Sequence, residues 1–189
     1  MKHTGTVRLE TERLILRRFT LNDAQQAFDN WMSREQVTRY MTWPPYQNTD
    51  DVKAYIQSVI AAYENPDTYY WAIEEKSVGQ VIGSISVIWL NEEVASAEVG
   101  YCLSDDFWGR GYMPEALRAV IRYLFETVGL NRVQAGHDVN NPNSGRVMEK
   151  CGMRYEGTMR QANRNNQGVC DTVIRAILKE DYIHANGKS

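Results

Sequence analysis

One stretch of the chain carries a clear helical pattern of apolar residues. Between Leu117 and Val128 these residues stand at i, i+3, i+4 and i+7, the spacing that lines one face of an α-helix. Pro114 lies where the first turn would be, and Gly129 follows the last apolar position. The pattern therefore predicts a strongly amphipathic helix that begins near Pro114 and ends at Gly129.

Three weaker patterns predict further helices. One covers about residues 23–32, and another covers about residues 50–63 behind a cap at Thr49 or Asp50. A third follows an asparagine-proline pair, which is typical of a helix start, and ends at Gly152. Between the first two helices, the loop over residues 40–46 is aromatic and is stiffened by two prolines.

Alternating and β-branched segments predict strands. In the segment 11–18, Leu14 and Leu16 lie on one face of a short strand. Further strands are expected over residues 69–74, 80–90, 95–103 and 132–139, and a polar turn over 163–168 joins two final strands in a hairpin. Because no repeat or linker divides the sequence, we expect a single domain over residues 1–189.

Composition and charge serve mainly to exclude classes of partner. Hydrophobic residues make up 43% of the chain, no apolar run approaches a membrane span, and the N-terminus lacks a signal-peptide apolar region, so we expect a cytoplasmic protein without membrane partners. A net charge of −3 argues against nucleic acid and slightly favours a cationic acceptor. Cys102, Cys151 and Cys170 are widely spaced, which indicates reduced thiols and no metal site.

The segment before the main helix is rich in glycine. Residues 105–116 read DDFWGRGYMPEA, so Gly109 and Gly111 expose backbone directly in front of a helix N-terminus. Free N–H groups and the positive end of the helix dipole suit a phosphate or pyrophosphate there. The alternative is a turn in which glycine only relieves strain. Neither the dinucleotide fingerprint nor the P-loop pattern is present.

The same segment resembles the coenzyme A pyrophosphate loop of the GNAT acetyltransferases. Further motifs follow in the family's order: EVGY at 98–101, NPNS at 141–144 and EKCGM at 149–153. Residues 11–17, TERLILR, resemble the opening of the RimJ/RimL branch, whose members acetylate N-terminal amines of ribosomal proteins. Trp108 and Met113 depart from the residues usual in the wider family, which should not disturb a site built from main-chain N–H groups.

The resemblance implies an α+β fold with three αβα layers and a mixed, strongly twisted sheet. The strands over 95–103 and 132–139 would splay apart, and the pantetheine arm of the cofactor, acetyl-CoA, would enter the gap, with no metal. An N–H on the first of these strands would polarise the thioester carbonyl. The implied cofactor-binding residues are Tyr101, Cys102, Leu103, Trp108, Gly109, Arg110, Gly111, Tyr112, Met113, Asn141 and Ser144.

The implied reaction is direct attack of a neutral amine on the thioester, so the departing thiolate needs a proton donor. Many family members carry a donor tyrosine where this chain has Met148. Ser144 lies one i, i+4 step earlier on the same helix face. We therefore predict Ser144 as the donor, against the alternative of an ordinary hydroxyl in a first helical turn.

The amine must also lose a proton. Glu98 is the leading predicted base because it shares a strand face with Gly100 beside the expected gap, although a strand glutamate is as often only solvated or salt-bridged. Weaker alternatives are Glu156, Asp138 and His137, and a water relay can replace them all.

The acceptor is the least determined part of the prediction. Tyr40 and Trp43 occupy the position of the family's acceptor pocket and are predicted to bind substrate, although Trp43 fits a core position equally well. A peptide N-terminal α-amine is the predicted acceptor. The alternatives are a small amine such as a polyamine, amino sugar or antibiotic, or a module that binds coenzyme A without turnover. Either a monomer or a homodimer is compatible with the sequence.

Overall fold

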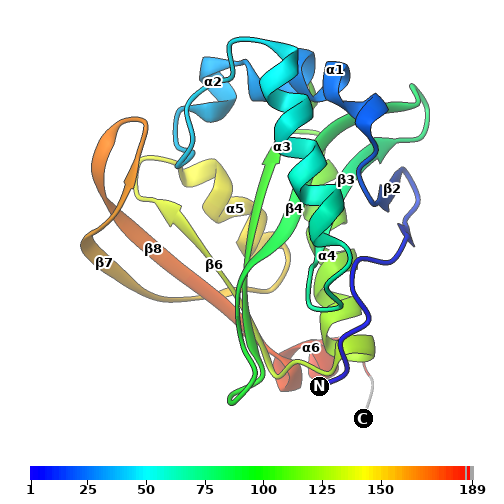
Figure 1. Ribbon diagram of the computed structural model, residues 1–189. Helices are drawn as coiled ribbons and strands as arrows, with labels where there is room; N and C mark the ends of the chain where they lie inside the picture. Colours follow the sequence, from blue (N-terminus) through cyan, green and yellow to red (C-terminus); the bar gives the residue numbers. More distant parts are fainter. Residues whose placement is uncertain (186, 188–189) are drawn as a thin grey trace.

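The computed structural model describes residues 1–185 and 187, which form one eight-stranded sheet with helices on both faces (Figure 1). The order is β1-β2-β3-β4-β5-β6-β8-β7, antiparallel except for the parallel pair β5–β6. The strands are β1 Leu9–Glu10, β2 Leu14–Arg17, β3 Tyr70–Glu75, β4 Gln80–Asn91, β5 Ser96–Leu103, β6 Arg132–Asp138, β7 Arg154–Asn165 and β8 Gly168–Leu178. The expected α+β class is confirmed.

The helices are α1 Ala24–Ala27, α2 Glu35–Thr38, α3 Thr49–Ala62, α4 Tyr112–Tyr123, α5 Pro142–Lys150 and α6 Lys179–Ala185. The helix expected over 23–32 is confirmed, although α1 continues from Phe28 to Met32 as a π-helical turn. A second π-helical turn, Leu124–Val128, extends α4 to Gly129, whose φ of +84° ends it as predicted. The cap of α3 is Asn48, whose side chain accepts from Asp51 N, rather than Thr49 or Asp50.

Two apolar cores lie on the two faces of the sheet. The larger core lies against α4 and α5, and the smaller core lies under α1 and α3. Trp71 and Ala72 are neighbours in β3, yet they belong to different cores because side chains alternate across a strand. No helix within the described residues is long and apolar enough to cross a membrane.

An ion-pair cluster ties β2 to the first helical segment. Arg17 contacts Asp23 at 2.8 Å and Glu74 in β3 at 2.6 Å. Burial alone would raise the pKa of Asp23, but hydrogen bonds from Arg17 and Thr20 outweigh burial and hold that pKa below its ordinary value. The cluster therefore requires an ionised Asp23.

The parallel pair at the centre of the sheet is short. The register between β5 and β6 runs only from Ser96↔Arg132 to Glu98↔Gln134, a total of three residue pairs. Beyond this point β5 stays beside β4, while β6 follows β8, and Figure 1 shows β6, β8 and β7 leaning away from β4 and β5. The expected splay is therefore present, and it opens one backbone edge of β5.

Candidate active site

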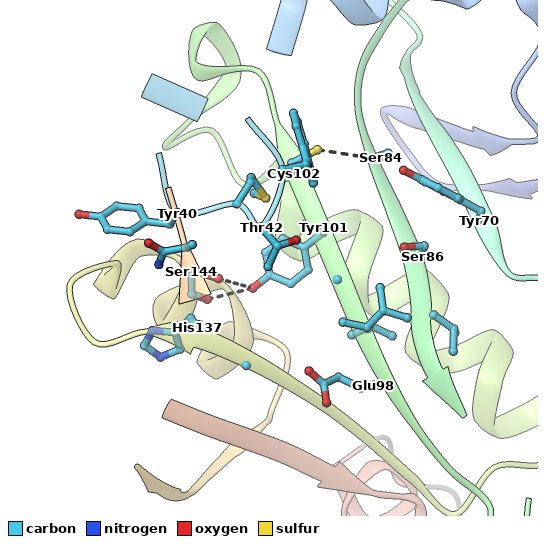
Figure 2. A pocket seen from close by; sticks show the side chains of 18 of the residues that line it. Tyr40, Thr42, Tyr70, Ser84, Ser86, Glu98, Tyr101, Cys102, His137 and Ser144 are labelled. Atoms are coloured by element: carbon cyan, nitrogen blue, oxygen red, sulfur yellow. Dashed lines mark hydrogen bonds between the residues drawn. The ribbon is translucent and has the colours of Figure 1, made fainter. Parts of the chain in front are cut away.

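A cavity of about 730 Å³ lies where β5 and β6 diverge. Its walls come from β3, β4, β5, β6, α3, the N-terminal end of α5, the π-helical turn after α1, the aromatic loop over 40–46 and the β7–β8 hairpin. Figure 2 shows Glu98, Tyr101 and Ser144 around this space. Segments that are distant in sequence therefore meet at the gap that the splay creates.

Tyr101 and Ser144 are joined across the gap. Tyr101 Oη donates to the carbonyl oxygen of Ser144 at 3.0 Å and lies 3.1 Å from Ser144 Oγ (Figure 2). Burial raises the pKa of Tyr101 well above its ordinary value, so the phenol stays neutral. Met148, on the same helix face, is fully buried in the core and cannot donate a proton.

Asn141 caps α5. Its Oδ1 accepts from the backbone N–H of Ser144 at 3.5 Å. Asn141 also lines the cavity. The cap fixes the first turn of α5 and, with it, the position of the Ser144 hydroxyl.

Glu98 lies at the base of the gap and, with Gln134, forms the last residue pair of the parallel register. Its Oε2 accepts from Gln134 Nε2 at 2.9 Å. Its Oε1 faces β6 at Gly136, where an added Cβ would lie 3.7 Å away. The absence of a side chain at Gly136 thus leaves space around this carboxylate, which points into the gap in Figure 2.

The other predicted base candidates have structural contacts. Asp138 is buried and accepts from Asn140 N at 2.8 Å and Asn165 Nδ2 at 2.7 Å. His137 Nδ1 lies 2.9 Å from the Asp138 carbonyl, and its buried Nε2 faces α5 at Gly145. Glu156, on β7, pairs with Arg132 at 2.6 Å and is not among the residues that line the cavity. Glu98 is therefore the better-placed carboxylate.

The backbone of β5 beyond Glu98 has β4 on one side and the gap on the other. Cys102 pairs with Ser84 of β4, and its thiol, turned into the smaller core, lies 3.4 Å from Ser84 Oγ. Burial raises the pKa of the Cys102 thiol to about 11, so it stays protonated. The carbonyl of Leu103 accepts from Trp108 Nε1 at 2.8 Å, a contact that sequence reasoning missed.

The glycine loop leads directly into α4. Gly109 has φ +75° and Gly111, at the N-cap, has φ +81°, a region that side chains with a Cβ rarely occupy. Tyr112 and Met113 begin the helix, and the Met113 side chain is buried in the larger core. The helix thus presents its free N–H groups at an exposed glycine turn, as an anion site requires.

The aromatic loop, predicted to bind the acceptor, forms one side of the cavity. Tyr40 and Trp43 both line the cavity and are half-buried, and Trp43 also packs on the smaller core. Asn166, at the tip of the β7–β8 hairpin, donates through Nδ2 to the carbonyls of Thr38 and Trp43, each at 2.8 Å. The hairpin tip therefore holds the loop in place, which no local sequence pattern indicated.

The chain matches the family model described as an acetyltransferase (GNAT) domain over residues 13–154. The uncharacterized N-acetyltransferase YoaA of Bacillus subtilis (strain 168) is 33% identical over 171 residues, 90% of this chain and 96% of that protein. The ribosomal protein uS5-alanine N-acetyltransferase of Escherichia coli (strain K12) is 24% identical over 183 residues, 93% of each chain. A crystal structure of a GNAT-family acetyltransferase from Bacillus anthracis superposes with a TM-score of 0.81 at 25% identity, covering 92% of this chain and 99% of that one.

The chain therefore belongs to the GNAT acetyltransferase family. It is an N-acetyltransferase, and the acyl donor of the GNAT acetyltransferases is acetyl-CoA. Within the described residues, no group of three or more His, Cys, Asp or Glu side chains is arranged to hold a metal ion.

Proposed function

We propose that this enzyme acetylates the α-amine of a peptide or protein N-terminus. The observation that carries the proposal is that the cavity offers only a weak candidate base. Glu98 is the one well-placed carboxylate, and it already accepts a hydrogen bond from Gln134. A peptide α-amine has a pKa of about 7.7 to 8.0, against about 10.4 for lysine, so a weak base is sufficient for it. The similarity to an alanine N-acetyltransferase supports the same acceptor class.

The residues present fit acetyl-CoA. The edge of β5 from 99 to 103 lies beside the gap, where a pantetheine arm can pair with it as an added strand. Gly109 and Gly111 bring free backbone N–H groups to the N-terminus of α4, where a pyrophosphate fits. Asn141 lines the cavity beside this strand edge. When bound, acetyl-CoA supplies the thioester that the amine attacks.

In the proposed reaction Glu98 takes the proton of the attacking amine through a water molecule. The new bond joins the amine nitrogen to the acetyl carbon, and the bond from that carbon to sulfur breaks. Ser144 gives its hydroxyl proton to the departing sulfur and regains a proton from solvent, and Tyr101, hydrogen-bonded to Ser144, holds the hydroxyl in place. Tyr40 and Trp43 line the space that the acceptor residue would occupy.

A small amine is the second candidate acceptor, and one observation favours it. Because Asn166 ties the hairpin tip to Trp43 and Thr38, the acceptor side is bounded by a wall. A bounded pocket of this kind suits a compact molecule such as an amino sugar or a polyamine. The same wall would limit a peptide to its first residues.

The test is acetylation of a short peptide that carries a free α-amine and one lysine, with the label located by mass spectrometry. We expect label on the α-nitrogen, and loss of labelling when the same peptide is N-terminally formylated. In the Glu98→Gln variant, kcat/KM for the free peptide should fall by about tenfold or more, since general bases contribute about 10² to 10⁴. Label on lysine alone, or on polyamines and no peptide, would contradict the proposal and favour the small-amine acceptor.

A further inference from the structure

Arg13, from the TERLILR segment, reaches the glycine loop from the far end of the chain. Its Nη1 donates to the carbonyl oxygen of Arg110 at 2.9 Å, and its guanidinium carbon lies 4.3 Å from the centre of the Tyr112 ring. A Cβ added to Gly111 would lie 3.5 Å from Arg13 Nη2. One side chain thus contacts the residues on both sides of Gly111 and lies close to Gly111 itself.

The same arginine is itself held by Glu115. Arg13 Nε and Nη2 donate to Glu115 Oε2 at 2.7 and 2.6 Å. Glu115 Oε1 accepts from the backbone N–H of Arg13 at 2.9 Å and from Thr11 Oγ1 at 2.6 Å. Burial raises the pKa of Glu115, but these hydrogen bonds more than offset it, so its pKa lies below the ordinary value. The guanidinium therefore has a fixed orientation.

The contact with Arg110 determines where the next N–H points. The Arg110 carbonyl and the Gly111 N–H belong to one planar trans peptide unit, so they point in opposite directions. When Arg13 holds the carbonyl, the Gly111 N–H is directed to the other side of the loop. A free N–H at the N-terminus of α4 is the group that an anion site uses.

Arg13 also changes the electrostatics at the N-terminus of α4. Glu115 lies in the first turn of α4, where its carboxylate would repel a pyrophosphate bound at the helix N-terminus. Arg13 neutralises that carboxylate by pairing with it. One residue thus orients the loop and removes its unfavourable charge.

We infer that Arg13 is a positioning residue for the cofactor loop, acting through Arg110 and Glu115 on the affinity for the pyrophosphate of the donor. The inference rests on the proposed pyrophosphate role of the loop. It assigns a task to the TERLILR segment: its Thr11 and Arg13 preorganise a binding site about 100 residues further along the chain.

The experiment compares two donors, acetyl-CoA and S-acetylpantetheine, which lacks the pyrophosphate and the adenosine. In the Arg13→Met variant we expect the KM for acetyl-CoA to rise about 10- to 100-fold, the range for loss of a charge-assisted hydrogen bond, with kcat nearly unchanged. The kcat/KM for S-acetylpantetheine should stay at the wild-type value. Arg13→Lys keeps the charge but not the planar fork, so its KM should also rise.

Arg17→Met is the matched control, because Arg17, four residues further along at the end of β2, makes comparable ion pairs but is held by Asp23 and Glu74, away from the loop. It should lose stability without changing the preference for acetyl-CoA over S-acetylpantetheine. An Arg13→Met enzyme that keeps this preference, or an Arg13→Lys enzyme with wild-type KM, would overturn the positioning role. A wild-type enzyme that uses both donors equally well would overturn the pyrophosphate loop itself, and the role of Arg13 with it.

Discussion

Tyr101 Oη lies within hydrogen-bond distance of both oxygens of Ser144, at 3.0 Å from the carbonyl and 3.1 Å from Oγ. A neutral phenol has one proton, and the carbonyl accepts it. The Tyr101 oxygen can then accept the Ser144 hydroxyl proton until a better acceptor, such as a thiolate, enters the gap. The Ser144 hydroxyl, the proposed proton donor, therefore has a hydrogen-bond partner before the thiolate forms.

Ser144→Ala should lower kcat by roughly tenfold to a thousandfold, because general acids typically contribute about 10² to 10⁴. The affinity for acetyl-CoA, measured by calorimetry, should change by only a few fold. Single-turnover kinetics would show whether the chemical step is the one affected. An unchanged rate for that step would eliminate Ser144 as the donor.

Tyr101→Phe should lower kcat by about two- to tenfold, because the variant loses one hydrogen bond but keeps the aromatic packing. If Tyr101 acts only through Ser144, the Tyr101→Phe, Ser144→Ala double variant should be no slower than Ser144→Ala alone. Additive losses would instead assign Tyr101 an independent role.

Gly111→Val should strongly weaken acetyl-CoA binding. The added Cβ meets Arg13 only at an ordinary contact distance of 3.5 Å, so the effect arises from the φ of +81°, which costs a β-branched residue about 1–2 kcal/mol or forces the loop to move. Gly79→Val is the matched control: its φ is +63°, and nothing lies within 4 Å of the added Cβ. It should lose comparable stability and bind acetyl-CoA normally. Near-native affinity in Gly111→Val would contradict the role of the loop.

Local patterns in the sequence predicted the parts of the fold that local patterns determine. Residue types that favour strands, bounded by polar or glycine breaks, placed β3, β4, β5 and β6 within a residue or two of their observed bounds, and the spacing from Leu117 to Val128 placed α4. The π-helical turns were missed because they retain the apolar pattern of a helix. The two-residue strand β1 and the helix α6 were also missed.

The residues of the candidate site show the same difference between local and long-range features. Gly111 and Ser144 stand in motifs with fixed spacing, so the sequence alone indicated them. The contacts that hold the site bridge long separations: Arg13 and Glu115 are 102 residues apart, and Thr38 and Asn166 are 128 apart. No periodicity links such residues, because only the tertiary fold brings them together.

Asp23→Asn should destabilise the protein at pH 7 by about 2 kcal/mol, since charge-assisted hydrogen bonds contribute about 1.5–3 kcal/mol. The pKa of Asp23 is lower in the folded state than in the unfolded chain, so acid favours unfolding of the wild type. The stability that Asp23 adds is complete above its unfolded pKa of about 3.9 and is lost as the pH falls through the folded value. Urea midpoints between pH 7 and pH 2.5 should therefore converge for the two proteins. A constant difference across this range would show that the ionised form is not responsible.

The parallel pairing between β5 and β6 is only three residue pairs long, so the two halves of the sheet are joined over a short distance. In the proposed complex, the pantetheine arm lies along β5 and takes the place of the missing section of the neighbouring strand. The donor is then a temporary part of the scaffold as well as a reagent. By mass action, the free energy of unfolding, and with it the resistance to proteolysis, would rise with the concentration of acetyl-CoA.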